Sequence, residues 1–350
     1  MDHIIIRILS REPHLSQVLT GYYMLFGRRF CRVEDRSEDL SYPYHVGMLE
    51  VEYKNKLIMY DMMDGYQYPE AIHYYLEKCD YYFKRSYSEK KNKVLDLPCL
   101  EKMYPYGFNY HVSCRNHPLD KSYIIEGIKA RLRMPNDQYN NKSTYYTSEI
   151  FEERPKYKTD NLKVLFLTRL WEPEDVYNEK VNEERRVINN TRIHILRELR
   201  KNKEINFVGG LSESEYVREC APDLIMPLDL TYRKNYIKEL HTSDICIGSM
   251  GLHESIGWKT GEYIAAAKAI VNEKFHYTVP GNFSPGKNYL EYHTVSECIQ
   301  AVEKLIKNPD ELFEMKKQNY MYYNSYLRPD VLIKNTLEIA DQGGDQYEHS

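Results

Sequence analysis

The first half of the chain alternates short apolar runs with an amphipathic stretch. Runs at 1–6, 56–60 and 80–83 have the length and composition of buried strands. Between the last two, helical spacing of apolar residues predicts a helix over 68–78 whose buried face is Ala71, Ile72, Tyr75 and Leu76. Such alternation of strand and helix indicates a parallel sheet. Residues 99–146 are rich in Pro, Gly, Asn and Tyr, and predict loops and short helices facing a cleft.

The second half repeats the alternation more regularly. Apolar runs predict strands at 163–168, 205–208, 224–226, 244–248 and 269–272. Helical patterns cover 182–202, 232–241, 295–307, 309–323 and 327–340. In the first of these helices, one stripe carries Ile188, Ile195, Leu196 and Leu199. This order of elements is typical of a doubly wound α/β domain.

A chain of 350 residues is long enough for two domains. The charged segment 152–161, which carries Pro155, is the best candidate for a linker. We therefore expect an N-terminal α/β domain at 1–155, a C-terminal α/β domain at 156–325, and a helix with a frayed tail at 326–350.

Composition narrows the class of protein. The net charge of −4 and pI near 6.3 give no basic character for binding nucleic acid. The seven cysteines are scattered, so reduced thiols in a cytoplasmic protein are the simplest interpretation. No apolar stretch approaches the length of a membrane span, and the first residues lack the features of a signal peptide. The signatures G-x-G-x-x-G, G-x-x-x-x-G-K-[ST] and H-E-x-x-H are absent, as is a Cys/His cluster with metal-ligand spacing.

Two glutamates in one strand–loop–helix segment, Glu254 and Glu262, are the strongest chemical signal. The apolar run 244–248 leads into a glycine-containing polar turn that holds Glu254, and a short helix then carries Glu262. In α/β folds ligands bind at the carboxyl ends of the strands. The free N–H groups of a helix start suit a phosphate, and a nearby carboxylate suits the hydroxyls of a ribose or sugar. An ordinary αβ unit with solvated glutamates is the alternative.

This segment resembles the donor motif of retaining glycosyltransferases with the GT-B architecture. Glu254, Gly257, Glu262, Ala265 and the pair Ile270-Val271 occupy positions of that motif. The stretch 266–269, Ala-Ala-Lys-Ala, departs from the Gly- and Pro-containing stretch that the family has there. The resemblance implies an α/β fold of two Rossmann-like domains facing a cleft, with a C-terminal helix that crosses back to the first domain.

The resemblance also implies roles for individual residues. Glu254 is expected near the donor sugar, and Glu262 is expected to bind the nucleotide ribose from an exposed helix start. Arg169 follows the strand 163–168 at the place of a family Gly-Arg-Leu, and Lys259 substitutes for a second family cation; both are expected at the diphosphate. A surface ion pair is the alternative for each of these two cations. The same loop and helix start supply the remaining candidate donor-binding residues, Gly251, His253, Ser255, Gly257 and Thr260.

The resemblance therefore implies transfer of a sugar from a nucleotide-sugar donor to a glycan or lipid-linked acceptor, in bacterial polysaccharide or glycoconjugate synthesis, with no metal and no other cofactor. A basic cluster over 84–93 offers contact with anionic lipid or with a lipid pyrophosphate acceptor, at the inner face of the membrane, or is a solvated turn. Candidate acceptor bases are His45, Asp61, Asp64 and His111, and the sequence selects none of them. An epimerase, an inverting transferase and a non-catalytic binding protein remain as alternatives.

Overall fold

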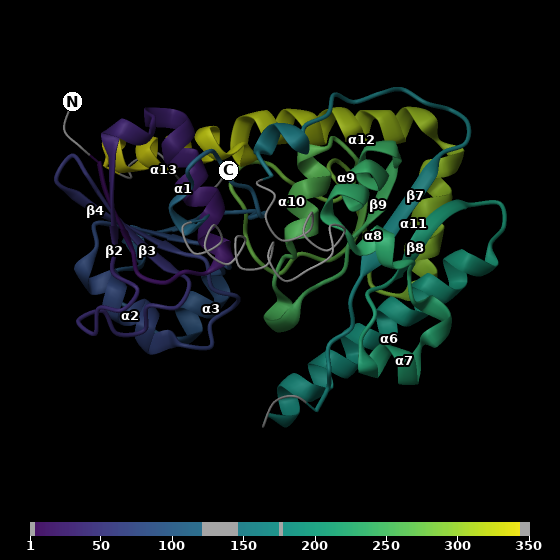
Figure 1. The fold of residues 1–350 in the computed structure, drawn as a ribbon, viewed down its shortest axis with the longest axis horizontal. Coiled ribbons are helices and arrows are strands. Elements are labelled where there is room, and N and C mark those ends of the chain that lie inside the picture. The colour runs from purple at the N-terminus through teal and green to yellow at the C-terminus, as the bar shows by residue number, and fades with distance from the viewer. Residues whose placement is uncertain (1–3, 121–145, 175–177, 344–350) are drawn as a thin grey trace, which may run out of the picture. The chain divides into compact units, whose positions relative to one another are not determined.

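A computed structural model of the protein describes residues 4–120, 146–174 and 178–343. The chain divides into two compact units, each of the predicted α/β class. The first unit comprises Met1–Ser148, His276–Gly281 and Asn324–Ser350, and the second comprises Glu149–Phe275 and Asn282–Tyr323. The last described helix therefore belongs to the first unit, together with the N-terminal segment (Figure 1).

The first unit is built on a six-stranded sheet. Across the sheet the strands are β2 (Cys31–Asp35), β1 (Ile4–Ile8), β3 (Met48–Tyr53), β4 (Lys56–Asp61), β5 (Tyr81–Lys84) and β6 (Met103–Pro105). The pairs β1–β2, β4–β5 and β5–β6 are parallel, as expected, but β3 is antiparallel to both β1 and β4. A two-residue turn at Lys54 and Asn55, both with positive φ, reverses the chain between β3 and β4.

The helices of the first unit bury the predicted residues. These helices are α1 (Ser16–Phe26), α2 (Pro69–Lys78), α3 (Glu89–Val94) and α13 (Pro329–Gln342). The buried residues of α2 are Ala71, Ile72, Tyr75 and Leu76, which confirms that helix and its apolar face. The sequence patterns did not predict α1, α3, β2, β3 or β6.

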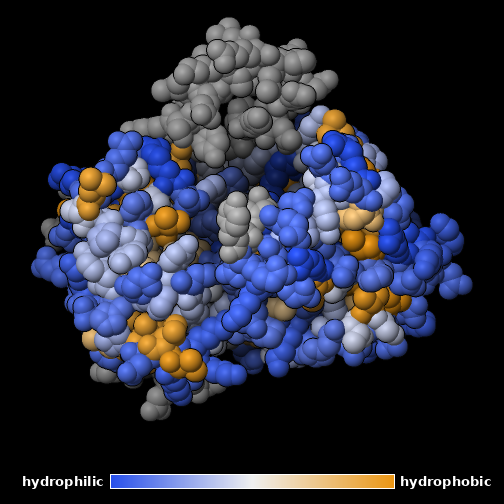
Figure 2. All heavy atoms as spheres, turned by 90° about the horizontal axis from the view of Figure 1, so that it is seen from below, coloured by the Kyte–Doolittle hydropathy of each residue, from blue (hydrophilic) through white to orange (hydrophobic). Residues whose placement is uncertain are grey.

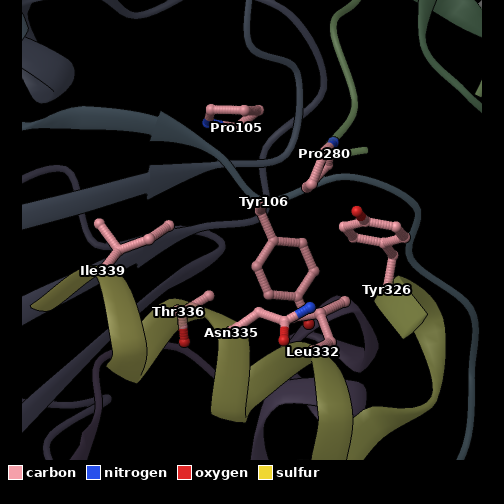
Figure 3. A pocket seen from close by; sticks show the side chains of 8 residues that line it. All are labelled: Pro105, Tyr106, Pro280, Tyr326, Leu332, Asn335, Thr336 and Ile339. Atoms are coloured by element: carbon pink, nitrogen blue, oxygen red, sulfur yellow. The ribbon is translucent and has the colours of Figure 1, made fainter. Parts of the chain in front are cut away.

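Close packing joins α13 to α1. A Cβ at Gly21 on α1 would lie 2.3 Å from the Pro329 carbonyl oxygen, so only glycine allows this approach. Gln17 donates to the Leu327 carbonyl oxygen at 3.2 Å, and the Tyr60 and Thr336 hydroxyls hydrogen-bond at 2.8 Å. Beside α13 lies a small, mainly apolar hollow, into which the rings of Tyr106 and Tyr326 project (Figure 3).

The second unit contains a fully parallel five-stranded sheet. The strand order is β11 (Leu290–Tyr292), β10 (Ala269–Glu273), β9 (Ile245–Ile247), β7 (Lys163–Thr168) and β8 (Asn206–Leu211). The chain runs from β7 to β8 on one side and then returns to β9 on the other side of β7. The direction of winding therefore reverses between β7 and β9, which is the place where doubly wound folds bind ligands.

Seven described α-helices accompany this sheet: α6 (Glu179–Lys201), α7 (Glu215–Cys220), α8 (Leu228–Thr231), α9 (Arg233–Thr242), α10 (Trp258–Ala265), α11 (Val295–Lys307) and α12 (Pro309–Tyr322). The predicted helices at 182–202, 232–241, 295–307 and 309–323 are confirmed as α6, α9, α11 and α12. The predicted strand at 224–226 is wrong, because Ile225 makes only an isolated bridge to Leu211 after a 3-10 turn at Pro222–Leu224.

The surface mixes polar and apolar side chains. On the face shown in Figure 2, hydrophilic residues dominate and hydrophobic ones gather in small groups. Apolar side chains at this density are ordinary on a protein surface. Residues 344–350 of the expected tail, and residues 121–145 of the expected loop region, lie outside the described residues.

Candidate functional site

The carboxyl ends of β7 and β9 are neighbours in the second sheet, and each is followed by a loop that carries candidate residues. Arg169 directly follows β7, and the loop Gly248–Glu254 follows β9. β7 pairs with β9 in parallel register, so both loops start at the same edge of the sheet. The topology thus brings Arg169 and the Glu254 segment to one edge, at the reversal of winding.

The loop after β9 has an unusual backbone. A Cβ at Gly248 would lie 1.9 Å from the Asn272 side-chain oxygen, so a larger residue at the start of the loop would require the buried Asn272 side chain to move. His253 and Glu254 both have φ of 60°. For residues with a Cβ this left-handed conformation costs free energy, and it persists where the surrounding contacts enforce it.

Three charged side chains from outside the loop hold this backbone. Glu273, at the end of β10, accepts a hydrogen bond from the Met250 N–H at 2.6 Å. Glu184 on α6 accepts from the N–H groups of His253 at 2.5 Å and Glu254 at 3.4 Å. Carboxylates make strong hydrogen bonds to backbone N–H groups, so these contacts fix the loop firmly.

Arg192 on α6 is the third of these side chains, and it links the two loops. Its guanidinium donates to the Ser249 hydroxyl at 2.9 Å, the Met250 carbonyl at 2.8 Å and the Arg169 carbonyl at 2.7 Å. The residue is only 6% exposed, and burial lowers the pKa of Arg192 to about 10. Among the described residues no carboxylate lies within ion-pair distance of this buried guanidinium.

Glu262 lies in α10, as expected, but its side chain is buried rather than exposed. Its side chain is 1% exposed and pairs with Arg233 at 2.7 Å. The Tyr236 hydroxyl donates to the same carboxylate at 2.5 Å. The expectation of an exposed glutamate is therefore wrong, because α9 packs Arg233 and Tyr236 onto this turn of α10.

Lys259 stands close to this group. Its ammonium lies 4.2 Å above the centre of the Tyr236 ring, a cation–π contact. Desolvation lowers the pKa of Lys259 to about 8, and the neighbouring positive charge of Arg233 acts in the same direction while Glu262 opposes it. An amine with this pKa changes its charge close to neutral pH.

Arg169 is an exposed residue whose guanidinium stacks on the Trp171 ring, with 4.2 Å from the guanidinium carbon to the ring centre. Arg192 exerts an electrostatic influence on Lys259, and Arg169 on Arg192, so the three cations share one neighbourhood. Neither Arg169 nor Lys259 has a carboxylate within ion-pair distance in the described part of the chain. The two predicted cations, Arg169 and Lys259, are thus accompanied by a third, Arg192, which the sequence patterns did not single out.

The other candidates of this segment are structural neighbours of the two glutamates. Gly251 donates its N–H to the Ser255 carbonyl at 2.9 Å, and a Cβ there would lie 2.5 Å from the Ser255 hydroxyl. Gly257 is the N-cap of α10, and Thr260 is buried in its first turn. Apart from residues adjacent in the chain, no described atom lies within 4 Å of the position of a Cβ at Gly257, so tertiary packing among the described residues does not require glycine there.

Candidates in the first unit have firm partners. Asp61 is fully buried, pairs with Lys84 at 2.7 Å and accepts from the Tyr82 hydroxyl at 2.7 Å. Asp64 pairs with Arg85 at 2.9 Å. Lys84 and Arg85 are 1% and 4% exposed, so the expectation that they belong to a solvated or lipid-facing basic cluster is wrong.

Two remaining candidate bases have polar neighbours. The Nδ1 of His45 lies 3.0 Å from the Tyr42 carbonyl oxygen, and His111 is half-buried. His111 contributes to the lowering of the pKa of His14 to about 4, after burial and Arg85 as larger causes. His14 was not a sequence candidate, because a single loop histidine carries no pattern.

Two polar residues of α6, Glu184 and Arg192, belong to this site although the apolar periodicity of the helix does not mark them. Glu184 and Arg192 lie four residues on either side of Ile188, on the face of α6 that packs inward. The sequence does contain a signal for them: both are polar residues at positions aligned with a buried apolar stripe. Such buried polar side chains require hydrogen-bond partners.

Within residues 4–120, 146–174 and 178–343, no helix has the length and apolar character needed to cross a membrane. In the same ranges, no three His, Cys, Asp or Glu side chains gather as metal ligands do.

Comparison with known proteins gives similarity in structure only. No protein-family model matches the sequence, and no curated protein matches it either. Among solved structures, the C-terminal domain of a glycosyl transferase group 1 family protein from Francisella tularensis is similar over 51% of this chain and 96% of its own, with 10% identity and a TM-score of 0.36.

Two further structures are similar over more of this chain. A mutant of S. aureus TarM, in complex with fondaparinux, alpha-GlcNAc-glycerol and UDP, covers 79% of this chain at 12% identity and a TM-score of 0.43. UDP-GlcNAc 2-epimerase from Neisseria meningitidis, bound to UDP-GlcNAc, covers 76% at 15% identity and a TM-score of 0.37. The chain spans 47% of the first of these proteins and 62% of the second. Similarity at this level does not assign an activity.

Proposed function

We propose that this chain is a metal-independent GT-B glycosyltransferase that moves a sugar from a nucleotide-sugar donor to a glycan or lipid-linked acceptor. The observation that carries the proposal is the segment from β9 to α10, in which Glu254 and Glu262 keep the spacing of the retaining donor motif. Its place at the reversal of strand order in the second sheet supports a ligand site there.

The cations at this edge suit an anionic donor. Arg169 and Lys259 carry positive charge without a carboxylate at ion-pair distance among the described residues. A nucleoside diphosphate brings negative charge that these groups can neutralise. As the sugar departs, charge grows on the diphosphate, and prearranged cations lower the free energy of that transition state.

The two glutamates take different roles in this proposal. Glu254, in the anchored loop, faces the donor sugar and stabilises the positive charge that develops at the anomeric carbon. Glu262 holds the ribose-binding position of the motif; because its side chain is 1% exposed, the ribose contacts it only when the donor displaces part of the packing by Arg233 and Tyr236. The loop residues Gly251, His253, Ser255 and the helix-start residues Gly257 and Thr260 complete the donor contact.

A thermal-shift screen with UDP-, GDP-, dTDP- and CMP-sugars tests donor binding. A ligand present at 100 times its Kd stabilises the native state by about 2.7 kcal/mol, which one donor in the series should show. Arg169→Ala should reduce this shift, whereas Arg197→Ala, which removes an exposed arginine of α6 paired with Asp223, should retain it. No shift with any of the four donors contradicts the proposal.

Product analysis then separates transfer from the alternatives. A transferase releases nucleoside diphosphate when an acceptor glycan or glycolipid is added, whereas an epimerase converts the donor without an acceptor. A binding protein shows affinity and no turnover. We place the reaction in the cytoplasm, and a lipid-linked acceptor would bring the enzyme to the inner face of the membrane; sedimentation with acceptor-containing vesicles tests that placement.

A further inference from the structure

Helix α6 contacts both loops at the reversal of strand order through its polar side chains. Asn189 hydrogen-bonds the N–H of Trp171 at 2.9 Å and the carbonyl of Trp171 at 2.7 Å, in the loop after β7. Arg192 reaches the carbonyl of Arg169 in that loop and also Ser249 and Met250 in the loop after β9. Glu184 contacts the far end of the second loop.

The spacing on α6 explains how one helix can reach both ends of the 249–254 loop. Glu184 and Arg192 are eight residues apart, so they lie on one face of the helix about two turns from each other. The negative side chain meets N–H donors and the positive one meets carbonyl and hydroxyl acceptors. Each charge therefore meets the end of the loop whose backbone dipoles complement it.

The contact made by Glu184 coincides with the strained part of the backbone. One carboxylate oxygen receives the N–H groups of both left-handed residues, His253 and Glu254. Without such an acceptor, these residues would lower their free energy by returning to an ordinary conformation. That change would redirect the side chain of Glu254.

Arg192 supports the other end in a way that a lysine cannot copy. Its three acceptors lie in two loops, and the planar guanidinium reaches all three at once. A lysine ammonium is a point donor on a flexible stem and does not reproduce this geometry.

We propose that Glu184 and Arg192 are positioning residues that hold the 249–254 loop in the conformation which presents Glu254 to the donor. The consequence for turnover rests on the proposed glycosyltransferase function. The claim that these residues hold the loop does not. Neither side chain needs to touch the substrate.

Hydrogen exchange of the intact protein tests the holding of the loop without any assay of activity. In Glu184→Ala, amides of His253 and Glu254 should exchange about tenfold faster or more, since hydrogen bonds to a charged acceptor are lost. Glu184→Gln keeps an oxygen acceptor and should restore most of the protection. The matched control is Glu183→Ala, which removes the adjacent glutamate of α6, 64% exposed and paired with Arg186, and should leave these amides unchanged.

Steady-state kinetics tests the consequence for the reaction. Glu184→Ala should lower kcat by roughly tenfold or more with donor KM changed less than about threefold, because Glu254 acts mainly in the transition state. Glu184→Gln should recover most of kcat, and Arg192→Lys should not recover the activity lost in Arg192→Gln. Unchanged exchange in Glu184→Ala overturns the inference, as does a kcat equal to that of Glu183→Ala. Failure of the wild-type protein to transfer any sugar refutes the proposed function instead, and leaves the exchange result valid.

Discussion

Replacement of Glu262 by glutamine should destabilise the second unit, even though the change is nearly isosteric. The carboxylate is 1% exposed, pairs with Arg233 at 2.7 Å and accepts from Tyr236 at 2.5 Å. Burial raises the pKa of Tyr236 well above its usual value, so the hydroxyl stays protonated and donates to Glu262. Glutamine can keep the bond from Tyr236, but it offers Arg233 no charge.

The size of the effect follows from the exposure of both partners. Breaking a fully buried pair by removing one partner costs roughly 3–5 kcal/mol. The Arg233 side chain is 23% exposed, so water recovers part of that loss. We therefore expect about 2–3 kcal/mol, which lowers the Tm of a unit of this size by about 4–12 °C.

Thermal unfolding of the ligand-free protein measures this directly. The control is Glu198→Gln on α6, whose glutamate is 48% exposed and pairs with Lys201 at 2.7 Å. Exposed pairs contribute about 1 kcal/mol or less, so the control should shift Tm by about 4 °C at most. Equal Tm values for the two variants would refute the argument that burial makes the Glu262 pair structural. Calorimetry with the nucleotide then reports the separate loss of ribose binding.

Three further changes have defined outcomes. Because the pKa of Lys259 is lowered to about 8, nucleoside diphosphate affinity should fall as pH rises from 7 to 9, and Lys259→Met should remove this dependence in calorimetry. The same depressed pKa means that the folded state binds fewer protons than the unfolded state between about pH 8 and 10.5. The charged lysine therefore lowers stability at neutral pH, and Lys259→Met should raise Tm at pH 7. Glu254→Gln should lower kcat by roughly a hundredfold or more with a modest change in donor binding, and NMR of the product made by the wild-type enzyme should show a retained anomeric configuration, an inverted product being contrary to the retaining assignment. Asp61→Asn should cost about 3–5 kcal/mol in chemical unfolding because it leaves the ammonium of Lys84 buried without its partner, and a loss below about 1 kcal/mol would contradict that.

Local sequence patterns determined much of the secondary structure. Apolar residues at helical spacing fixed α2 with its buried face, and fixed α6, α9, α11 and α12. Apolar runs located β4, β5, β7, β9 and β10. These patterns succeed because they report which side of an element faces the core, and that information is contained in neighbouring residues.

The strand–loop–helix segment was also readable from the sequence. The order of apolar run, glycine-containing turn and amphipathic helix placed Glu254 in a loop after β9 and Glu262 in α10, as the structure has them. The sequence did not predict the antiparallel strand β3, because a hairpin returns the chain where a crossover was expected.

The partners of the charged side chains were decided only by the tertiary structure. Glu262 is buried because α9 brings Arg233 and Tyr236 against it, and α9 is separated from α10 along the chain by β9 and the loop that follows it. Glu184 and Arg192 meet the loop after β9 because β9 pairs with β7 on the side opposite β8, which no local pattern encodes. Periodicity determines that a face is buried, whereas hydrogen bonds and ion pairs depend on which faces meet, and that is fixed only when the sheet assembles.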